Sequence, residues 1–406
     1  MSMDTQNNYF DNIDKNPIFK NQDYLESEFI PSKNDFKCRG DEIEQIKKYL
    51  GRISHGKSGQ NFIVTGNTGY GKTACVKIVL NDLEQYMKQN ENEFEYLHIE
   101  DNSSERDVLR EISDYFEWKY KGNDLKRYYK KLEEEIIDNN LEFVLVLDEL
   151  DQLFKSSSDS DYGNRILKRL YETRSAIMNA GSGGLTIIGI TNNVNLEEML
   201  NSKNVSRGYT SNTIHFSSYT ANQLRVILDS RAEKAFKDHV LDDGITSKIS
   251  AYVAQEDGDA RSAIQTLRMA GQLALDQDRE KVPRRFVDKA RNQIEKDKVI
   301  EAVEKLPKQS KIIMYSLLDH RKEELITGEL YDKYENICEK QDVHDVTQRR
   351  FRDLIKDLDM MGMLNATPHN QRDTGGRTHL IQYDHSQKVI DDIKNHIEKA
   401  VFRISE

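Results

Sequence analysis

The sequence predicts an α/β domain built on a parallel sheet, followed by two mainly helical units. Within residues 19–215, short apolar runs alternate with stretches of helical periodicity, and strands separated by helices predict a parallel sheet covered on both faces. The run over residues 143–147 is continuously apolar, which is typical of a strand buried on both faces. After Tyr219 the pattern becomes helical.

The first unit is expected to contain five strands with helices between them. The strands are expected at residues 61–65, 94–99, 143–147, 185–191 and 212–216. Two of the intervening helices are expected at residues 73–89 and 164–180. With 406 residues, 14 Phe and 19 Tyr, the chain is long enough and aromatic enough for several folded domains.

Two further units are expected in the second half of the chain. Thr220-Ala-Asn-Gln223 has the pattern of a capping box, in which the Thr hydroxyl and the Gln amide satisfy the first backbone donors of a helix. Helices of the second unit are expected at residues 243–255, 260–277 and 284–306. The third unit begins near Lys308, with helices expected at residues 311–320, 328–340, 347–361 and 386–402 and two short strands around Gly375 and Gly376.

Composition excludes several classes of protein. The 59 basic and 70 acidic side chains give a net charge of −11, which argues against a simple basic nucleic-acid coat protein, although a local basic surface can lie on an acidic body. Cys38, Cys75 and Cys338 lie far apart without a C-x-x-C motif, so neither a disulfide framework nor a zinc site is supported. The start of the chain is unlike a secretory signal, and the longest apolar run near its middle is far short of the ~20 residues of a membrane span. We therefore expect a soluble cytoplasmic protein with no membrane partner.

A glycine-rich motif follows the first expected strand and opens a helix. It comprises Gly66, Asn67, Thr68, Gly69, Tyr70, Gly71, Lys72 and Thr73, and Ala74 comes next. In a P-loop the glycines let consecutive backbone N–H groups surround phosphate oxygens, Lys72 adds a positive charge at the β- and γ-phosphates, and Thr73 offers a hydroxyl to Mg²⁺. A glycine-rich surface turn is the alternative. The strand–loop–helix context favours a site for ATP or ADP with Mg²⁺.

An acidic pair follows the strand expected at residues 143–147. Asp148 is expected to hold Mg²⁺ through water, and Glu149 to orient and polarise the water that attacks the γ-phosphate. Such a pair is common at strand ends, but together with the P-loop it predicts an ATPase site. Asp151 has two interpretations, a charge at a helix N-terminus or a ligand.

Two further polar residues are expected to sense the γ-phosphate. Asn192 follows the strand expected at residues 185–191, where its amide would position the attacking water, and an ordinary Asn-Asn turn is the alternative. In the second unit, Gly258-Asp-Ala-Arg261 lies at a helix start. Gly258 permits the turn, Asp259 can cap the helix, and Arg261 is expected to point towards the cleft. The alternative is a capped helix with a solvated Arg.

The order of these motifs resembles that of AAA+ ATPases, and more narrowly that of archaeal replication initiators related to the largest origin-recognition-complex subunit and the helicase-loading cell-division-cycle protein. The resemblance covers residues 17–402. It rests on Phe29-Ile-Pro31, Cys38-Arg39-Gly-Asp-Glu42, Leu147-Asp-Glu-Leu-Asp-Gln-Leu153, Ile187-Ile-Gly-Ile-Thr-Asn192, Arg231-Ala-Glu-Lys-Ala-Phe236 and Gly258-Asp-Ala-Arg261. It implies an AAA+ parallel-sheet ATPase base at 18–217, a helical lid at 218–300 and a C-terminal winged-helix domain at 301–406. The start of the chain, at 1–17, is Asn/Asp-rich without periodicity and is expected to be a mobile leader.

The resemblance also assigns roles to several residues. Asn192 resembles sensor 1, Arg261 resembles sensor 2 reaching the γ-phosphate from the lid, and the segment around Arg39 resembles the adenine side of the site. The family carries a helical insertion that touches DNA, here about residues 103–121, where Trp118 and Lys119 suit stacking and phosphate contact. An amphipathic helix that packs its aromatic side chains inward is the alternative.

One stretch departs from the family pattern. Family members usually carry an Arg-Val pair just before the last strand of the ATPase domain, and this Arg acts in trans as an arginine finger. Here Asn204 aligns with that Arg, and Arg207 lies one turn further on. Arg207 is the candidate substitute. Without a substitute, hydrolysis stimulated by assembly is in doubt, since a working finger is worth roughly 10³–10⁵ in rate.

The third unit carries candidate DNA-binding residues. In the helix expected at residues 347–361 the apolar side chains form one face, and the basic side chains fall largely outside it, where they could meet a groove or phosphates. These basic side chains are Arg349, Arg350, Arg352 and Lys356. Residues 365–383 are expected to form a two-stranded wing, with Arg372, Gly375 and Arg377 at or near its tip. Acidic neighbours such as Asp353 and Asp357 reduce the local positive field, so a winged helix that contacts protein is the alternative.

The leading hypothesis is an ATP-dependent replication initiator. Its implied partners are double-stranded origin DNA, the replicative helicase and further copies of itself on DNA, which would place it at the nucleoid. Hydrolysis of ATP to ADP and phosphate is expected to be slow, Mg²⁺-dependent and used as a switch. The alternatives are a nucleotide-switched ATPase whose winged helix binds protein, and an AAA+ ATPase of the mobile-element or clamp-loading type.

Overall fold

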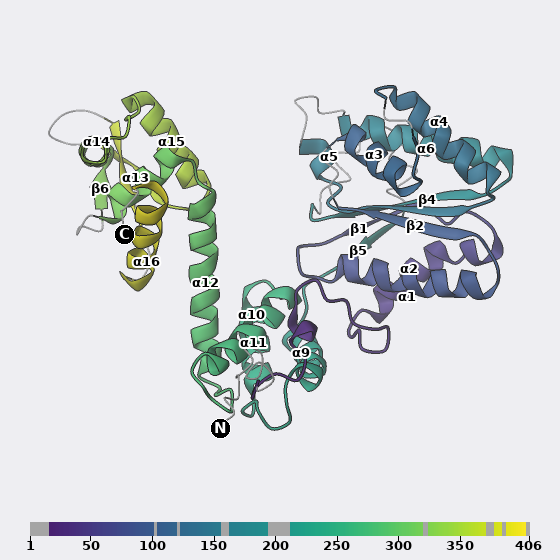
Figure 1. Cartoon of the computed structure of the whole chain (residues 1–406), viewed down its shortest axis with the longest axis horizontal. Helices are drawn as coiled ribbons and strands as arrows, with labels where there is room; N and C mark the ends of the chain where they lie inside the picture. Colours follow the sequence, from purple (N-terminus) through teal and green to yellow (C-terminus); the bar gives the residue numbers. More distant parts are fainter. Residues whose placement is uncertain are drawn as a thin grey trace, which may run out of the picture. The chain divides into compact units, whose positions relative to one another are not determined.

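The chain forms two compact units, Met1–Ala290 and Arg291–Glu406, each of which is described by itself. The computed structural model describes residues 16–100, 104–119, 122–155, 162–193, 212–319, 324–370, 377–383 and 387–402 (Figure 1). All but the last two residues of the expected leader at 1–17 lie outside these ranges. The finer division into base, lid and winged helix at residues 217 and 300 stays a prediction.

The first unit contains a five-stranded parallel sheet. Its strands are β1 (Phe62–Thr65), β2 (Phe94–Ile99), β3 (Glu142–Leu147), β4 (Gly184–Thr191) and β5 (Thr213–His215). Their order in the sheet is β2-β3-β4-β1-β5, and every paired neighbour is parallel. The five predicted strands are therefore confirmed, with ends that differ by one residue at most. Because β1 lies beside β4 and β4 beside β3, the carboxyl ends of these three strands meet at one edge.

Helices cover both faces of this sheet, as the alternation of strands and helices predicts (Figure 1). On one face lie α1 (Gly40–Leu50) and α2 (Lys72–Gln89), and on the other lie α3 (Glu105–Tyr115), α4 (Leu125–Asp138) and α6 (Tyr162–Ala180). The pleat of β3 divides its side chains between the two layers, since Val144 and Val146 face α1 and α2, whereas Phe143 and Leu145 face the opposite layer. Short elements complete the base: η2 (Ile53–His55) and α5 (Gln152–Lys155). A further short helix, η1 (Gln22–Leu25), packs on the helices that follow the sheet.

The helical part of the first unit follows β5. It consists of α9 (Ala221–Ala235), α10 (Ile245–Glu256), α11 (Ala260–Leu275) and the start of α12 (Phe286–Lys305). The capping box predicted at the start of α9 is present, because the Thr220 hydroxyl accepts from the Gln223 N–H and the Gln223 amide oxygen accepts from the Thr220 N–H. Leu224, Leu228 and Leu267 fill a core of their own, separate from the two cores of the sheet.

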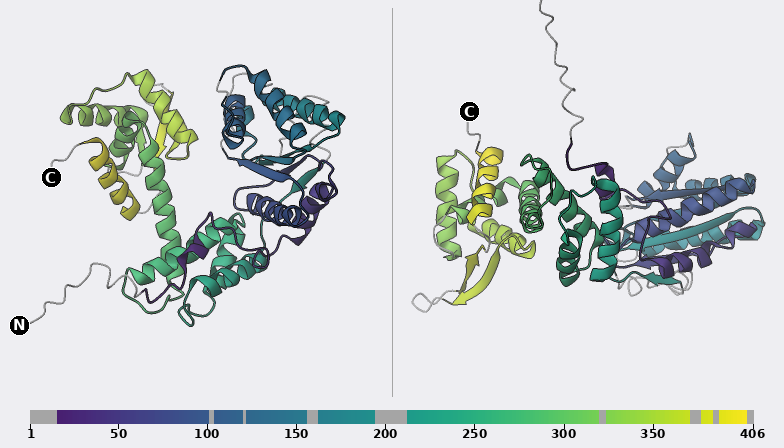
Figure 2. Two further views of the ribbon diagram at one scale, coloured as in Figure 1. Left: turned by 45° about the vertical axis from the view of Figure 1, so that its right-hand side comes forward. Right: turned by 90° about the horizontal axis from the view of Figure 1, so that it is seen from below.

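The N-terminal segment belongs to this helical core, which the sequence did not predict (Figure 2). Ile18, Phe19 and Leu25 are buried against the lid helices, and the Phe19 and Phe236 ring centroids lie 4.9 Å apart. The half-buried guanidinium of Arg231 donates to the carbonyl oxygens of Tyr24 and Phe29 at 2.9 and 3.0 Å. These bonds fix an otherwise irregular segment to α9.

The second unit is a winged-helix domain. Its elements are the last part of α12, α13 (Lys308–Leu318), β6 (Glu324–Ile326), α14 (Thr327–Lys340), α15 (Gln348–Met360), β7 (Asn365–Asn370), β8 (Arg377–Gln382) and α16 (Gln387–Val401). The antiparallel order β6-β8-β7 contains the predicted hairpin, together with β6, whose three residues are too few to show a strand period. The predicted apolar face of α15 is buried at Phe351, Leu354, Ile355 and Leu358, whereas Met361, which was expected on the same face, follows the end of the helix and is 62% exposed. Across the described part of both units, no helix is long and apolar enough to cross a membrane.

Candidate nucleotide site between the sheet and the lid

The glycine-rich loop between β1 and α2 needs glycine at the positions that the motif predicts. Gly66, Gly69 and Gly71 have φ angles of +143°, +78° and +84°, a region that other residues rarely adopt. A Cβ atom on Gly69 would lie 1.4 Å from an Asp259 carboxylate oxygen, and one on Gly66 would lie 2.4 Å from the Phe216 carbonyl oxygen. The loop is thus held closely between the sheet and the lid, with its backbone in the conformation of a phosphate-binding turn.

Lys72 begins α2 and is almost fully buried. Its ammonium donates to the carbonyl oxygens of Gly66 and Asn67 at 2.7 and 2.9 Å, and to the Asn192 amide oxygen at 2.8 Å. Burial lowers the pKa of Lys72 to about 8, although the nearby Asp148 carboxylate opposes the shift. A desolvated ammonium held by neutral oxygens is well placed to attract an anion.

Thr73 and Asp148 lie side by side, as a shared metal site requires. The Thr73 hydroxyl donates to Asp148 Oδ2 at 2.7 Å, and Nε2 of His98 lies 3.1 Å from the same oxygen. Burial raises the pKa of Asp148, but the hydrogen bonds from His98 and Thr73 outweigh it, so the pKa stays below its ordinary value. The Asp148 carboxylate is therefore ionised, and a carboxylate oxygen is the kind of ligand that Mg²⁺ prefers.

Glu149 adopts a backbone conformation that is rare for a residue with a side chain. Its φ angle is +51°, its N–H donates to Asp148 Oδ1 at 2.9 Å, and its carboxylate accepts from the Gln152 amide. Such conformations persist where the surrounding structure enforces them, and they cluster at active sites. Asp151 stands directly before α5, at a helix start as one of its two interpretations expected, and it does not line the cavity described below. Its buried carboxylate accepts a hydrogen bond from Thr191 at the end of β4 at 2.9 Å.

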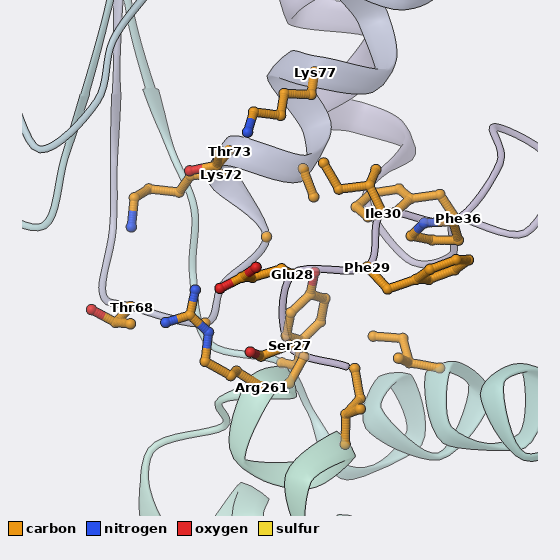
Figure 3. Close-up of a pocket in the computed structure, with 18 of the residues that line it drawn as sticks. Ser27, Glu28, Phe29, Ile30, Phe36, Thr68, Lys72, Thr73, Lys77 and Arg261 are labelled. Atoms are coloured by element: carbon orange, nitrogen blue, oxygen red, sulfur yellow. The ribbon is translucent and has the colours of Figure 1, made fainter. Parts of the chain in front are cut away.

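The lid approaches the phosphate loop directly. The Ala260 N–H donates to the Gly69 carbonyl oxygen at 3.2 Å, and the Tyr70 hydroxyl donates to the Asp257 carbonyl oxygen at 2.9 Å. Asp259 caps α11, as expected, by accepting from the Arg261 N–H at 2.7 Å. In Figure 3 the Arg261 side chain extends from the start of α11 into the space beneath the P-loop. The Gly258-to-Arg261 motif therefore faces the site from the lid.

A cavity of about 730 Å³ lies between the sheet, the lid and the N-terminal segment (Figure 3). Ten of the predicted site residues line it: Thr68, Gly69, Gly71, Lys72, Thr73, Ala74, Asp148, Glu149, Asn192 and Arg261. Sequence reasoning missed the apolar side of the cavity, which is formed by Ile30, Phe36, Tyr219, Ile227 and Ile264. The apolar Phe29-Ile-Pro31 stretch is the signal in the sequence that points to this wall. The volume and the polar–apolar division suit a nucleotide.

Arg39 does not line this cavity, contrary to the expected contact with the adenine side. Its buried guanidinium donates to the carbonyl oxygens of Tyr70 and Ser217 at 3.1 and 2.6 Å, and it lies 3.8 Å from the centre of the Tyr219 ring. These contacts join the P-loop to the start of the lid. Arg39 is thus placed to fix the walls of the site rather than to touch its ligand.

The two candidate residues of the helical insertion have different surroundings. Trp118 is 7% exposed, its ring is stacked on Phe116, and its indole N–H donates to Glu135 at 3.0 Å. In this conformation the indole cannot stack on a base, and the inward packing weighed as the alternative is what the structure shows. Lys119 is exposed at the surface.

The winged-helix candidates divide by what the structure describes. Arg349, Arg350, Arg352 and Lys356 are all exposed on α15, opposite its buried face. Arg377 begins β8, but its side chain, together with Arg372 and Gly375, lies outside the described residues. Arg207 and Asn204 lie outside them as well.

Comparison with known proteins first defines the class. The ATPase family associated with various cellular activities (AAA) matches residues 62–232, the Cdc6 AAA+ ATPase-type lid domain matches residues 225–292, and the CDC6 C-terminal winged helix domain matches residues 301–393. The fold and the site therefore define an AAA+ ATPase, a nucleotide-binding protein, with a Cdc6-type lid and a C-terminal winged helix.

Full-length relatives then define the family. An ORC1-type DNA replication protein of Pyrococcus horikoshii is 36% identical over 361 residues, which cover 86% of this chain and 83% of the relative. One from Thermococcus kodakarensis is 35% identical over 395 residues, covering 94% and 92%. The chain belongs to the ORC1-type DNA replication proteins, a family of archaeal replication initiators. Among solved structures, that of the Aeropyrum pernix ORC1 protein in complex with DNA is similar, with 28% identity, a TM-score of 0.78, and coverage of 95% of this chain and 98% of that one.

Proposed function

We propose that this chain is an ATP-controlled initiator, which binds Mg²⁺-ATP between sheet and lid and grips origin DNA through its winged helix. The observation that carries the proposal is the convergence of Lys72, Asp148 and Asn192 in one cavity with Arg261 of the lid. Lys72, Asp148 and Asn192 follow the neighbouring strands β1, β3 and β4, and Arg261 lies at the start of α11. These residues are far apart in the sequence, and folding brings them together. Slow hydrolysis would then reset the bound state.

The phosphates would lie over the P-loop at the start of α2. The backbone N–H groups of the loop and the positive end of α2 favour negative charge there. Lys72 would exchange its three oxygen partners for phosphate oxygens. The negative charge of the phosphates would compensate for the hydration that the buried ammonium lost. Nucleotide binding would therefore raise the pKa of Lys72 from about 8.

Mg²⁺ fits the residues beside the phosphates. Thr73 and Asp148 bring two oxygens within 2.7 Å of each other, and the described residues include no cluster of three or more His, Cys, Asp or Glu side chains that would form an all-protein metal cage. Mg²⁺ commonly uses one or two protein ligands together with phosphates and water. When bound, the ion would neutralise charge on the β- and γ-phosphates.

Hydrolysis needs a base, a residue that positions water and a contact from the lid. Glu149 lies on the cavity wall next to Asp148, where its carboxylate would take a proton from the attacking water. Asn192, already in contact with Lys72, would position that water, and Arg261 would contact the γ-phosphate when the lid is closed. If copies assemble on DNA, Arg207 would act as the finger towards a neighbour.

DNA binding is proposed for the exposed cations of α15 and for the wing. Arg349, Arg350, Arg352 and Lys356 present positive charge on the side of α15 away from the core. The Aeropyrum pernix ORC1 protein was solved in complex with DNA, which supports the same role here. Arg372, Gly375 and Arg377 would contribute from the wing, and Lys119 from the insertion. Recruitment of the replicative helicase and location at the nucleoid are further parts of this proposal.

Two variants separate nucleotide binding from hydrolysis. Lys72→Ala should abolish binding of ATP in calorimetry, because it removes the buried cation at the phosphates. Glu149→Gln should keep that binding but lower the turnover rate by about 10²–10⁴-fold, the usual contribution of a general base. Parental turnover in Glu149→Gln would show that another group is the base.

The DNA proposal is tested by fluorescence anisotropy with an origin repeat and with random DNA. Arg350→Ala should weaken binding and reduce the slope of log affinity against log salt by about 0.9 if one phosphate contact is lost. Lys340→Ala is the matched control, because Lys340 is an exposed cation of the same domain on α14. Equal isotherms for Arg350→Ala and the parent would count against α15 as the DNA-contacting helix.

A further inference from the structure

A line of polar contacts runs along the metal side of the cavity and includes one residue with no assigned role. The His98 ring lies between Asp148, whose Oδ2 is 3.1 Å from Nε2, and Glu100, whose Oε1 is 3.4 Å from Nδ1. Glu100 in turn pairs with Lys77 at 3.2 Å, and Asp148 accepts from Thr73. Each of these side chains except His98 lines the cavity.

The sheet brings His98 to this place. In the parallel register of β2 and β3, His98 pairs with Val146 and Ile99 with Leu147, and the Asp148 N–H donates to the Ile99 carbonyl oxygen at 2.9 Å. The backbone of the residue after β3 is therefore fixed against the end of β2. The His98 side chain is only 9% exposed, so water competes poorly for its contact with Asp148.

The contact constrains the carboxylate that the proposed metal needs. The Asp148 side chain has two rotatable bonds, and its two oxygens are held from different sides: Oδ1 by the N–H of Glu149, and Oδ2 by both His98 and Thr73. Among these donors, the Glu149 N–H and the Thr73 hydroxyl come from the two active-site motifs, whereas His98 comes from a separate strand. His98 therefore adds a constraint on Asp148 that neither motif supplies.

We infer that His98 is a positioning residue, which holds the Asp148 carboxylate in the orientation that serves Mg²⁺ next to Thr73. We assign the ring proton of His98 to Nε2, because the Nε2–H group then donates a hydrogen bond to the carboxylate oxygen Asp148 Oδ2. Groups that hydrogen-bond a metal-ligating side chain orient it, and their loss typically costs 10–100-fold in metal affinity or activity. Glu100 is 73% exposed, so its longer contact with His98 carries less weight.

This inference rests on the proposed function, because Asp148 must serve the metal for its orientation to matter. A positioning role can be distinguished from a purely structural role by its dependence on Mg²⁺. A residue that only stabilised the fold would weaken nucleotide binding with or without metal. His98 should instead affect only the part of nucleotide affinity that depends on Mg²⁺.

The test uses the full chain and a fluorescent, non-hydrolysable ATP analogue, titrated in EDTA and then at rising Mg²⁺. His98→Leu should leave the affinity in EDTA unchanged and raise the Mg²⁺ concentration for half-maximal tightening by about tenfold. His98→Gln, which has an amide N–H at a similar reach, should restore most of the parental response. His55→Leu is the control, because His55 is exposed in η2.

Each outcome decides the matter. A His98→Leu protein with the parental Mg²⁺ response, or one whose affinity in EDTA falls equally, would overturn the positioning role. If His98→Leu does not fold, His98→Gln decides, because it should fold and respond to Mg²⁺ nearly as the parent does, and a tenfold loss in that variant would contradict a role based on the hydrogen bond. If the parental protein shows no tightening with Mg²⁺, the proposed metal site fails first, and the inference fails with it.

Discussion

Two carboxylates at opposite ends of β3 show what decides the charge of a buried acid. Glu142, the first residue of the strand, is 6% exposed, and within the described residues no donor reaches its Oε2 atom, so burial raises its pKa to about 7. Asp148 comes directly after the last residue of the same strand, and its pKa lies below the ordinary value in spite of burial. The difference lies in the donors, because His98, Thr73 and the Glu149 N–H all reach Asp148.

The position of these donors follows from the parallel sheet. At the carboxyl end of the strands, the chain turns into α2 and the loops after β3 and β4, so hydroxyl, amide and N–H groups collect there. At the other end, Glu142 lies beside Gly184 of β4, and the opposing charges of Arg174 and Arg52 only moderate the shift of its pKa. Ligand chemistry is thus confined to one edge of the sheet.

The largest expected effect separates the two ends by function. Asp148→Asn should lower Mg²⁺-dependent ATP hydrolysis by at least about 100-fold, because it removes a charged ligand beside Thr73. Glu142→Gln, at the far end of the same strand, should hydrolyse ATP at the parental rate. Equal losses in a steady-state phosphate-release assay would mean that both carboxylates act through folding, and the comparison would break.

The second prediction concerns stability and pH. The pKa of Glu142 is raised in the folded state from 4.5 to about 7, so the folded protein binds more protons in this range than the unfolded chain does. The free energy of unfolding should therefore fall as pH rises from about 4.5 to 7, by on the order of 3 kcal/mol from this group. Glu142→Gln carries no proton to lose. Its urea midpoint should exceed the parental one at pH 8, and identical pH profiles would contradict the raised pKa.

The third prediction extends the comparison to a buried cation. Because the pKa of Lys72 is lowered to about 8, its ammonium is largely deprotonated at pH 9 in the free protein, and binding a phosphate must first restore the proton. ADP affinity should fall about tenfold between pH 7 and pH 9. Lys72→Arg should bind with a flatter profile, since Arg keeps its charge. The measurement is calorimetry of ADP binding over this pH range. If the ADP affinity fell equally in both proteins, a group other than Lys72 would be responsible.

The smallest expected effect lies at the contact between lid and P-loop. Tyr70→Phe keeps the ring but removes the hydrogen bond from the Tyr70 hydroxyl to the Asp257 carbonyl oxygen. A loss of about 1 kcal/mol, or several-fold in nucleotide affinity, is expected. Tyr96→Phe is the matched control, because the Tyr96 hydroxyl bonds to Asn81 on the exposed side of α2 and away from the cavity. An equal change in both variants would argue against a link between this bond and the site.

The sequence predicted what is local or follows from a shared sheet edge. The P-loop residues are contiguous, so their chemistry is legible without a structure, and Asp148 and Asn192 could be paired because parallel strands end at the same edge. The five strands and the capping box at Thr220 were confirmed for the same reason. Strong local patterns leave few alternatives.

What the sequence could not predict depends on contacts between distant segments. The cavity wall around Ile30 and Phe36 comes from a segment with no period. The residues just before it, such as Leu25, pack on helices about 200 residues later, whereas Phe36 packs against the core of the sheet. The resemblance pointed to the neighbourhood of Arg39, but its partners are backbone carbonyl oxygens, which no side-chain pattern reveals. A single His within a strand, such as His98, gives no signal until the register places it beside Asp148.

The half-buried Arg231 has a mechanical consequence. Its hydrogen bonds to the carbonyl oxygens of Tyr24 and Phe29 attach this N-terminal segment to the lid, although the segment precedes every strand of the sheet. Ile30 and Pro31, which line the chamber, directly follow this stretch, so a movement of α9 relative to the sheet would also shift this wall of the chamber. A truncation that begins at the P-loop would leave both a gap in the chamber and an unfilled hollow in the lid.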